Sequence, residues 1–253
     1  MQCAAPAPSS LPILPLTVTL RAARLVYGGL TLFDGLDLEL TSGCFTCLLG
    51  PSGIGKSSLL RLLAGLTTRG ISGELRGGDG LPLTGRVAYM AQEDLLLPWL
   101  NVLDNVTLGS RLRGERPDRE RALQLLAQVD LADYALARPE TLSGGMRQRV
   151  ALARTLMENR PVVLMDEPFS GLDALTRLRL QALAAELLAD RTVLLVTHDP
   201  LEALRLGDQV WVMNGRPATL FPLAELPGAP LRDPGEPAVQ TAYRAILHLL
   251  GAG

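Results

Sequence analysis

Residues 44–63 read CFTCLLGPSGIGKSSLLRLL, and this stretch decides the fold. Its first six residues form a near-continuous apolar run that predicts a buried strand, and its leucines predict a helix from about Ser57 to Leu66. Between them, Gly50–Ser57 matches the pattern GxxxxGK[ST] in full. Glycines let successive backbone N–H groups turn toward one point, and the positive end of the following helix adds attraction for an anion. The stretch therefore predicts a phosphate-binding loop, and the strand–loop–helix order disfavours the alternative of a chance glycine turn.

The residues of this loop have distinct expected roles in holding a nucleotide. Lys56 is expected to reach the β- and γ-phosphates, and the Ser57 hydroxyl is expected to ligate Mg²⁺. Lys56 is also the only lysine among 24 basic residues. An arginine-rich composition explains most of that bias, but a compact ammonium group suits this position. The expected nucleotide contacts in the loop are Gly50, Pro51, Ser52, Gly53, Ile54, Gly55, Lys56, Ser57 and Ser58.

A second apolar run, Val162–Met165, leads directly into Asp166 and Glu167. In a parallel α/β sheet, ligands bind beyond the carboxyl ends of the strands, so both carboxylates are expected on the side where the loop opens. Asp166 is then placed to hold Mg²⁺, and Glu167 to accept a proton from the attacking water or to orient it. The alternative is a surface acidic pair or a helix cap, which the abrupt change from apolar to acidic residues disfavours.

Ser143 precedes an apolar-faced helix and is followed by Gly144 and Gly145. Serine is a favourable N-cap, and the two glycines leave backbone N–H groups uncovered at the positive end of the helix. This pattern predicts a second anion site. A plain capped helix is the alternative that the residues alone leave open.

The composition excludes several classes of protein. The chain has 253 residues, of which 47% are apolar, and its 24 basic and 26 acidic residues give a net charge of −2. That balance gives no support to broad nucleic-acid binding, so no nucleic-acid partner is expected. Three cysteines argue against a disulfide framework, and we interpret Cys44 and Cys47 as core residues. No run reaches the roughly 18 apolar residues of a membrane-spanning helix, and the N-terminus is a poor signal peptide.

The pattern along the chain predicts an α/β P-loop NTPase with a mainly parallel core sheet, an N-terminal antiparallel β subdomain and an inserted α-helical subdomain. Residues 1–16 are expected to be a flexible leader. Residues 17–91 and 159–215 are expected to form the nucleotide-binding core, because residues 17–40 alternate in polarity and later runs are continuously apolar. Residues 92–158 have helical spacing, with Pro117 expected in the first turn of one helix. Residues 216–253 form a C-terminal segment with a last helix near 239–250.

With these residues in hand, most of residues 17–215 closely resembles the ATP-binding subunits of ABC transporters. The phosphate loop, Gln92 at the sheet-to-helix junction, the signature Leu142–Met146, the acidic strand end, a D-loop at 170–173 and the switch histidine His198 occur in the family's order. Tyr27 matches the aromatic residue that stacks on adenine. Met146 stands where glutamine is commonest, and Ser58 where threonine is usual. Neither departure removes an assigned phosphate ligand.

The resemblance implies a head-to-tail homodimer with a second ATP-binding subunit. Each of two ATP molecules would be held by one subunit's loop and by Ser143, Gly144 and Gly145 of the other. ATP would then join the subunits and its hydrolysis would loosen them. The implied catalytic residues are Glu167, His198 and Gln92, and the implied Mg²⁺ site comprises Ser57, Gln92 and Asp166.

The resemblance further implies an ATPase that couples ATP hydrolysis to solute transport, in the direction of import, through separate membrane permease subunits. Such a subunit would be cytoplasmic and peripheral on the inner face of the membrane, in a system with a solute-binding protein. The segment Gln92–Trp99 would form a groove for the permease, with core packing as the alternative. Two rival functions remain. One is a soluble ABC-type ATPase of DNA repair or translation, although such chains usually carry two cassettes or a long coiled-coil insertion. The other is a binding module that ATP holds together without being hydrolysed. The presence of Glu167 and His198 disfavours this function.

Overall fold

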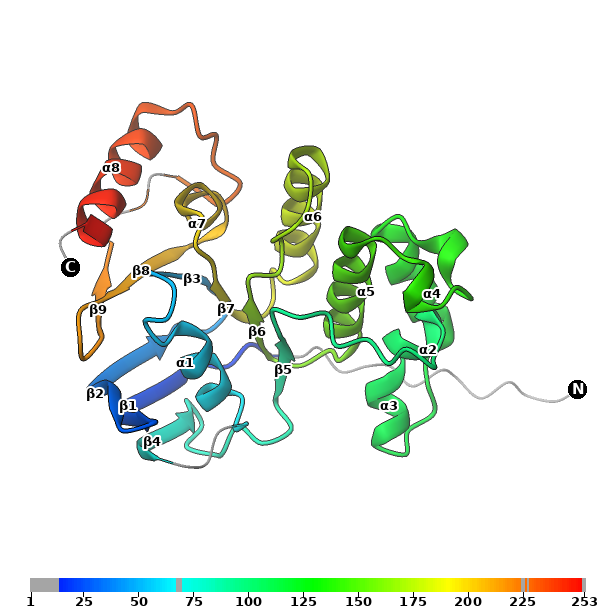
Figure 1. Cartoon of the computed structure of the whole chain (residues 1–253), viewed down its shortest axis with the longest axis horizontal. Helices are drawn as coiled ribbons and strands as arrows, with labels where there is room; N and C mark the ends of the chain where they lie inside the picture. Colours follow the sequence, from blue (N-terminus) through cyan, green and yellow to red (C-terminus); the bar gives the residue numbers. More distant parts are fainter. Residues whose placement is uncertain (1–13, 67–69, 224–225, 227, 252–253) are drawn as a thin grey trace, which may run out of the picture.

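The computed structural model describes residues 14–66, 70–223, 226 and 228–251. Its central element is a six-stranded sheet with the order β5-β6-β7-β3-β8-β9, in which only β9 is antiparallel to its neighbour (Figure 1). The strands span Val87–Met90 (β5), Val162–Asp166 (β6), Thr192–Val196 (β7), Phe45–Leu49 (β3), Gln209–Asn214 (β8) and Thr219–Pro222 (β9). Every residue of β3, β6 and β7 is buried, as expected for parallel strands covered on both faces.

Successive residues of the central strands alternate between two hydrophobic cores. Cys47 and Met165 pack in the core that includes residues of the helices, whereas Leu48 and Leu164 pack in the core shared with α1 and a second sheet. This second sheet is antiparallel, with the order β2-β1-β4, and its strands span Leu30–Leu40 (β2), Val18–Tyr27 (β1) and Ile71–Gly77 (β4). The predicted fold class, a mainly parallel sheet with an antiparallel β subdomain, is confirmed.

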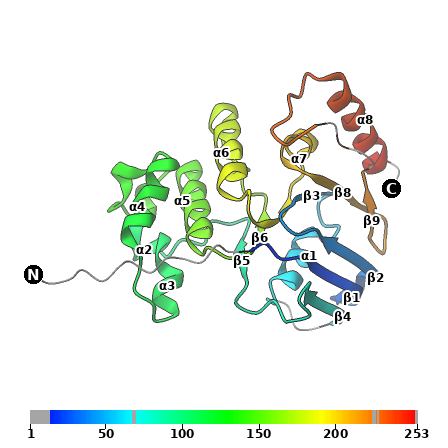
Figure 2. The same cartoon turned by 180° about the vertical axis from the view of Figure 1, so that it is seen from behind.

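One group of helices, the run α2–α5, lies beyond the β5 edge of the central sheet (Figure 1). Figure 2 shows from behind that this group is separate from the two sheets. The group comprises α2 (Val102–Val106), α3 (Leu108–Leu112), α4 (Arg119–Gln128), α5 (Gly144–Met157) and the 3-10 helices Ala132–Tyr134 and Pro139–Thr141. The other helices are α1 (Lys56–Leu63), α6 (Ala174–Leu187), α7 (Pro200–Leu206) and α8 (Pro237–Gly251).

Several predicted boundaries differ from the structure. The helix after the phosphate loop ends at Leu63 rather than Leu66, because Gly65 takes a φ of +71° that terminates it. Pro117 is not in a first turn: it precedes the N-cap Asp118, whose side chain accepts a hydrogen bond from the Arg121 N–H. The strand β9 was not predicted, since its sequence TLFP lacks an alternating pattern.

The start of the described chain is joined to the central sheet. Leu16 is buried, and its N–H donates a hydrogen bond to Thr192 Oγ1 at 3.2 Å. The predicted leader up to residue 13, with Cys3, lies outside the described residues. Cys44 immediately precedes β3 and Cys47 is buried within it, and both thiols are free. Among the described residues, no helix has the length and apolar character needed to cross a bilayer.

Candidate active site

The loop Gly50–Gly55 connects β3 to α1, and its glycines are required by its geometry. A Cβ on Gly50 would lie 2.6 Å from the carbonyl oxygen of Met213, and Gly53 and Gly55 have φ values of +76° and +113°. These positive φ values disfavour any residue with a side chain. The sequence pattern therefore corresponds to a backbone that other residues could not adopt.

Lys56 begins α1 and is only 7% exposed. Its Nζ donates hydrogen bonds to the carbonyl oxygens of Gly50 at 2.7 Å and Pro51 at 2.9 Å, so the ammonium group folds over the loop. Burial lowers the pKa of Lys56, while the nearby charges of Glu167 and Asp166 oppose this shift. The only lysine of the chain therefore faces both carboxylates that the sequence singled out.

Asp166 is the last residue of β6 and is 2% exposed. Burial raises its pKa, a hydrogen bond with Ser57 lowers it, and the adjacent charge of Glu167 raises it. The strand end and the first turn of α1 therefore bring a carboxylate and a hydroxyl together. Both groups offer hard oxygen ligands of the kind that Mg²⁺ takes.

Glu167 is the point at which the predicted catalytic residues meet. Its Oε2 lies 3.1 Å from Nδ1 of His198 and 3.4 Å from Nε2 of Gln92, which donates to it. These three residues come from the ends of β6 and β7 and from the segment after β5, which are adjacent in the sheet. The parallel sheet thus carries them to one edge, the edge that the sequence predicted for Glu167.

The backbone of Glu167 is in the left-handed region, with a φ of +48°. Such a conformation is costly for a residue with a side chain and persists where the surroundings hold it. The Glu167 N–H donates to Val196 O at 2.9 Å, and its carbonyl accepts from Ser170 Oγ at 2.9 Å. The turn that aims the carboxylate is therefore fixed by both β7 and the following loop.

Gln148 contacts the loop after Glu167, and the sequence reasoning gave it no role. It lies on α5, is 8% exposed, and donates from Nε2 to Pro168 O at 3.1 Å. The sequence feature that could have revealed it is a polar residue on the buried, otherwise apolar side of a helix, two positions before Val150. Two further missed residues, Thr197 and Glu202, are buried beside His198.

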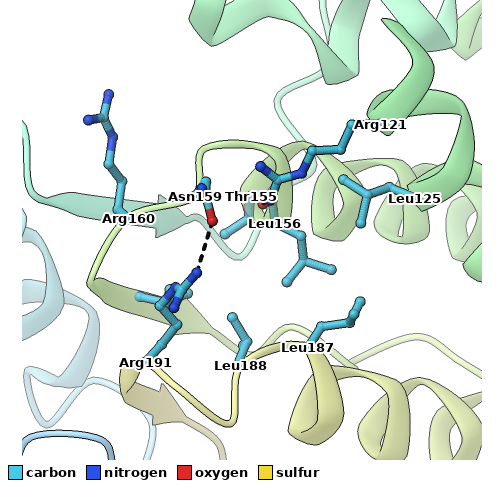
Figure 3. Close-up of a pocket in the computed structure, with 10 residues that line it drawn as sticks. Arg121, Leu125, Thr155, Leu156, Asn159, Arg160, Leu187, Leu188 and Arg191 are labelled. Atoms are coloured by element: carbon cyan, nitrogen blue, oxygen red, sulfur yellow. Dashed lines mark hydrogen bonds between the residues drawn. The ribbon is translucent and has the colours of Figure 1, made fainter. Parts of the chain in front are cut away.

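One cavity, with a volume of about 100 Å³, belongs to the site and is lined by Glu167, Phe169, Ser170, Gly171, Arg177, Thr197, His198, Asp199 and Glu202. A second cavity, of about 80 Å³, lies between α4, α5 and the end of α6 (Figure 3). There Arg191 donates to Asn159 Oδ1 at 2.9 Å and Arg121 to Leu156 O at 3.2 Å. Those guanidinium groups bind the last turn of α5 and the residues that follow it. We therefore interpret the second cavity as part of the packing between these helices and not as a ligand site.

The predicted second anion site is apart from the phosphate loop. Ser143 is the N-cap of α5, and its Oγ accepts from Met146 N at 3.3 Å. A Cβ on Gly144 would meet nothing within 4 Å, so the helix tip is open. Among the described residues, no hydrogen bond or ion pair joins Ser143–Gly145 to the phosphate loop, and α5 and α1 lie in different parts of the molecule (Figure 1).

Two other predicted contact regions are on the surface. Tyr27 ends β1 and is 76% exposed. In the segment 92–99, Leu96 is buried, whereas Leu95 and Trp99 are exposed. Arg154 of α5 donates to the carbonyl oxygens of Asp94 at 2.6 Å and Leu95 at 2.9 Å, so this segment is attached to the same helix that begins at Ser143.

Comparisons with known proteins identify the family to which this sequence is similar. The family model described as "ABC transporter" matches residues 33–170. An uncharacterized ABC transporter ATP-binding protein of Haemophilus influenzae is 46% identical over 199 residues, which cover 78% of this chain and 82% of the relative. The aliphatic sulfonates import ATP-binding protein SsuB of Granulibacter bethesdensis is 46% identical over 237 residues, which cover 92% of this chain and 94% of that relative.

A solved structure is similar over most of the fold. It is the dimeric, post-hydrolysis state of the ATP-binding cassette MJ0796 bound to ADP and Pi. The TM-score is 0.73 at 30% sequence identity, and the match covers 84% of this chain and 100% of that one.

Proposed function

The chain belongs to the ABC transporter family, and from this premise we propose that two copies assemble head to tail and hydrolyse ATP at sites formed between them. The chain is the ATP-hydrolysing subunit of such a transporter. The proposal concerns how its residues act, and which solute and partners it serves.

The observation that carries the proposal is the separation of the two anion sites within one chain. The phosphate loop lies close to Glu167 and Asp166, whereas the open helix tip at Ser143 lies on α5 with no bond to that loop. A second copy related by rotation could place its Ser143, Gly144 and Gly145 against the γ-phosphate. The similar cassette MJ0796 is described as dimeric, which supports this arrangement.

Within each site, the residues have separate roles. Lys56 and the N–H groups of its loop hold the phosphates, Glu167 accepts or orients a proton of the attacking water, and His198 and Gln92 hold the carboxylate of Glu167 in place. Tyr27, exposed at the end of β1, provides a surface for adenine.

Mg²⁺ fits the donor set of Ser57, Asp166 and Gln92, which consists of hydroxyl, carboxylate and amide oxygens. In the described part of the chain, no cluster of three or more histidine, cysteine or acidic residues could hold a metal unaided. Phosphate oxygens and water would complete the coordination of an ion held by Ser57, Asp166 and Gln92. When bound, it offsets the negative charge of the phosphates.

The proposed solute is an aliphatic sulfonate, because the relative that covers 92% of this chain is named for import of these compounds. The proposed permease contact is the segment 92–99, where Trp99 is 67% exposed and Leu95 is 57% exposed. Exposed aromatic anchors of this kind are typical of interfaces. The subunit would then lie on the cytoplasmic face of the membrane and act with a solute-binding protein. The import names of its relatives disfavour a role in DNA repair or translation.

The test of the site is Glu167→Gln. The variant should bind ATP, lose turnover by about a thousandfold, and run as an ATP-dependent dimer on a sizing column, because the amide cannot accept the proton. Glu186→Gln, an exposed change on α6 away from both proposed anion sites, is the matched control and should behave like the wild type. Normal turnover in Glu167→Gln would overturn the role given to Glu167.

The solute is tested with the assembled transporter. Its ATPase rate should rise when the binding protein carries a short alkanesulfonate and not when it is offered the carboxylate of the same chain length. Equal stimulation by both compounds, or by neither, would contradict the proposed solute while leaving the site assignment intact.

A further inference from the structure

The imidazole of His198 is not held in place by packing. Its side chain is 63% exposed, yet its Nδ1 lies 3.1 Å from Oε2 of Glu167. Because most of this side chain is in contact with solvent, its position depends on the backbone that carries it. The residues on either side of His198 therefore decide whether the imidazole reaches Glu167.

The backbone at His198 is held in place by the neighbouring residue Thr197, which is 1% exposed. The Thr197 N–H donates to Leu48 O of β3 at 3.1 Å. On the other side of His198, the Asp199 N–H donates to Thr197 Oγ1 at 3.0 Å. One hydroxyl thus bridges across the histidine and sets the turn that presents it.

The hydroxyl of Thr197 is in turn held by Glu202 of α7, to whose Oε2 it donates a hydrogen bond. Glu202 is 7% exposed, and its Oε1 accepts from Nε2 of the buried Gln181 on α6 at 3.4 Å. Glu202 lines the 100 Å³ cavity that contains Glu167 and His198, and also a neighbouring cavity of about 200 Å³ between α6 and α7. A buried carboxylate with two donors from other elements is a costly arrangement that needs a reason.

We propose that Glu202 is a positioning residue for ATP hydrolysis: it accepts the Thr197 hydroxyl and so fixes the turn that places His198 against Glu167. This inference rests on the roles proposed above for Glu167 and His198. It assigns to Glu202 the function of a hydrogen-bond acceptor, and not that of a charge.

The surroundings of Glu202 agree with that distinction. Burial raises its pKa to about 7, hydrogen bonds from Thr197 and Gln181 lower it, Asp199 raises it and Arg177 lowers it. Burial, and then the charge of Glu202, raise the pKa of the Cys47 thiol on β3, which is a further group near this carboxyl. Oε1 of Gln181 is buried without a hydrogen-bond partner. If that amide is rotated, Gln181 Oε1 accepts a hydrogen bond from a protonated Oε1 of Glu202, so both protonation states keep Oε2 available to Thr197.

The experiment compares kcat and KM for MgATP in paired variants. Thr197→Val removes the hydroxyl with little change of shape and should lower kcat about tenfold with KM within about twofold, since a small misplacement of a catalytic group is costly. Thr197→Ser keeps the hydroxyl and should stay within about twofold of the wild type. Glu202→Ala should resemble Thr197→Val, and Glu202→Gln should resemble the wild type, since its amide oxygen can accept the same bond.

A second background separates positioning from general stability. In His198→Ala, the further change Thr197→Val should not lower kcat again, because the group it positions is gone. Wild-type kcat in Thr197→Val, or equal loss in Glu202→Gln and Glu202→Ala, would overturn the inference. Should Thr197→Val not fold, the Glu202 pair decides. Wild-type turnover in His198→Ala alone would instead overturn the site assignment on which the inference rests.

Discussion

Gln148 Nε2 lies 3.1 Å from the carbonyl oxygen of Pro168 and donates a hydrogen bond to it. Gln148 lies on α5, whose N-cap is Ser143, and Pro168 directly follows Glu167. The helix that carries the proposed anion site is therefore bonded to the loop that carries Glu167, the proposed catalytic carboxylate, in the same chain. A partner's phosphate bound at Ser143 would act on a helix already joined to the hydrolysis loop.

The first prediction concerns this bond. Gln148→Leu should lower the free energy of unfolding by about 1–3 kcal/mol, because the buried carbonyl of Pro168 loses its donor. The ATPase rate should also fall several-fold, as the left-handed turn at Glu167 loses a support. Thermal unfolding and steady-state hydrolysis measure the two effects. Gln124→Leu, at an exposed position of α4, is the control, and an equal loss in both variants would refute the explanation.

Lys56→Arg should bind ATP at least about a hundredfold more weakly, although the charge is kept. The buried ammonium of Lys56 fits over two carbonyl oxygens, and a planar guanidinium needs more room and a different donor geometry. Titration with a fluorescent ATP analogue reports the affinity. Retention of wild-type affinity would show that charge alone suffices at this position.

Two glycine variants should separate folding from dimerisation. Gly50→Ala should destabilise the protein by several kcal/mol, on the order of other overpacking changes, because its Cβ would lie 2.6 Å from a backbone oxygen. Gly144→Ala meets no neighbour and lies in the first turn of α5, so the melting temperature should stay equal or rise. In a Glu167→Gln background, Gly144→Ala should nevertheless weaken the ATP-dependent dimer on a sizing column. An undiminished dimer would argue against the proposed contact in trans.

The buried carboxyl of Glu202 should make stability depend on pH. Burial raises its pKa from 4.5 to about 7, so the folded state binds a proton that the unfolded state has lost between these values. The stabilisation from this proton is complete below pH 4.5 and is lost as the pH rises through about 7. The resulting change in the free energy of unfolding is at most about 3 kcal/mol.

Glu202→Gln removes this titration. The variant should therefore be more stable than the wild type at pH 8, and its advantage should shrink toward pH 5, as denaturant unfolding at the two pH values would measure. An advantage that does not change with pH would show that Glu202 is not the titrating group.

The phosphate loop could be predicted from the sequence because its chemistry is local. Eight consecutive residues contain the glycines, the lysine and the serine, and the flanking apolar runs define the strand and the helix. The acidic strand end and the helix N-cap at Ser143 are local for the same reason, and the structure has both at the predicted residues. Helix ends were harder: Pro117 lies outside its helix because the adjacent Asp118 is the better cap.

What the sequence determined by itself is this set of local structures and their order along the chain. Only the tertiary structure decided that Glu167, His198 and Gln92 meet around one carboxylate oxygen, and that Thr197 and Glu202 support the histidine from below the surface. The physical reason is that strand order and the pairing of distant segments depend on how whole faces pack, and no periodicity within a short window of sequence reports that packing.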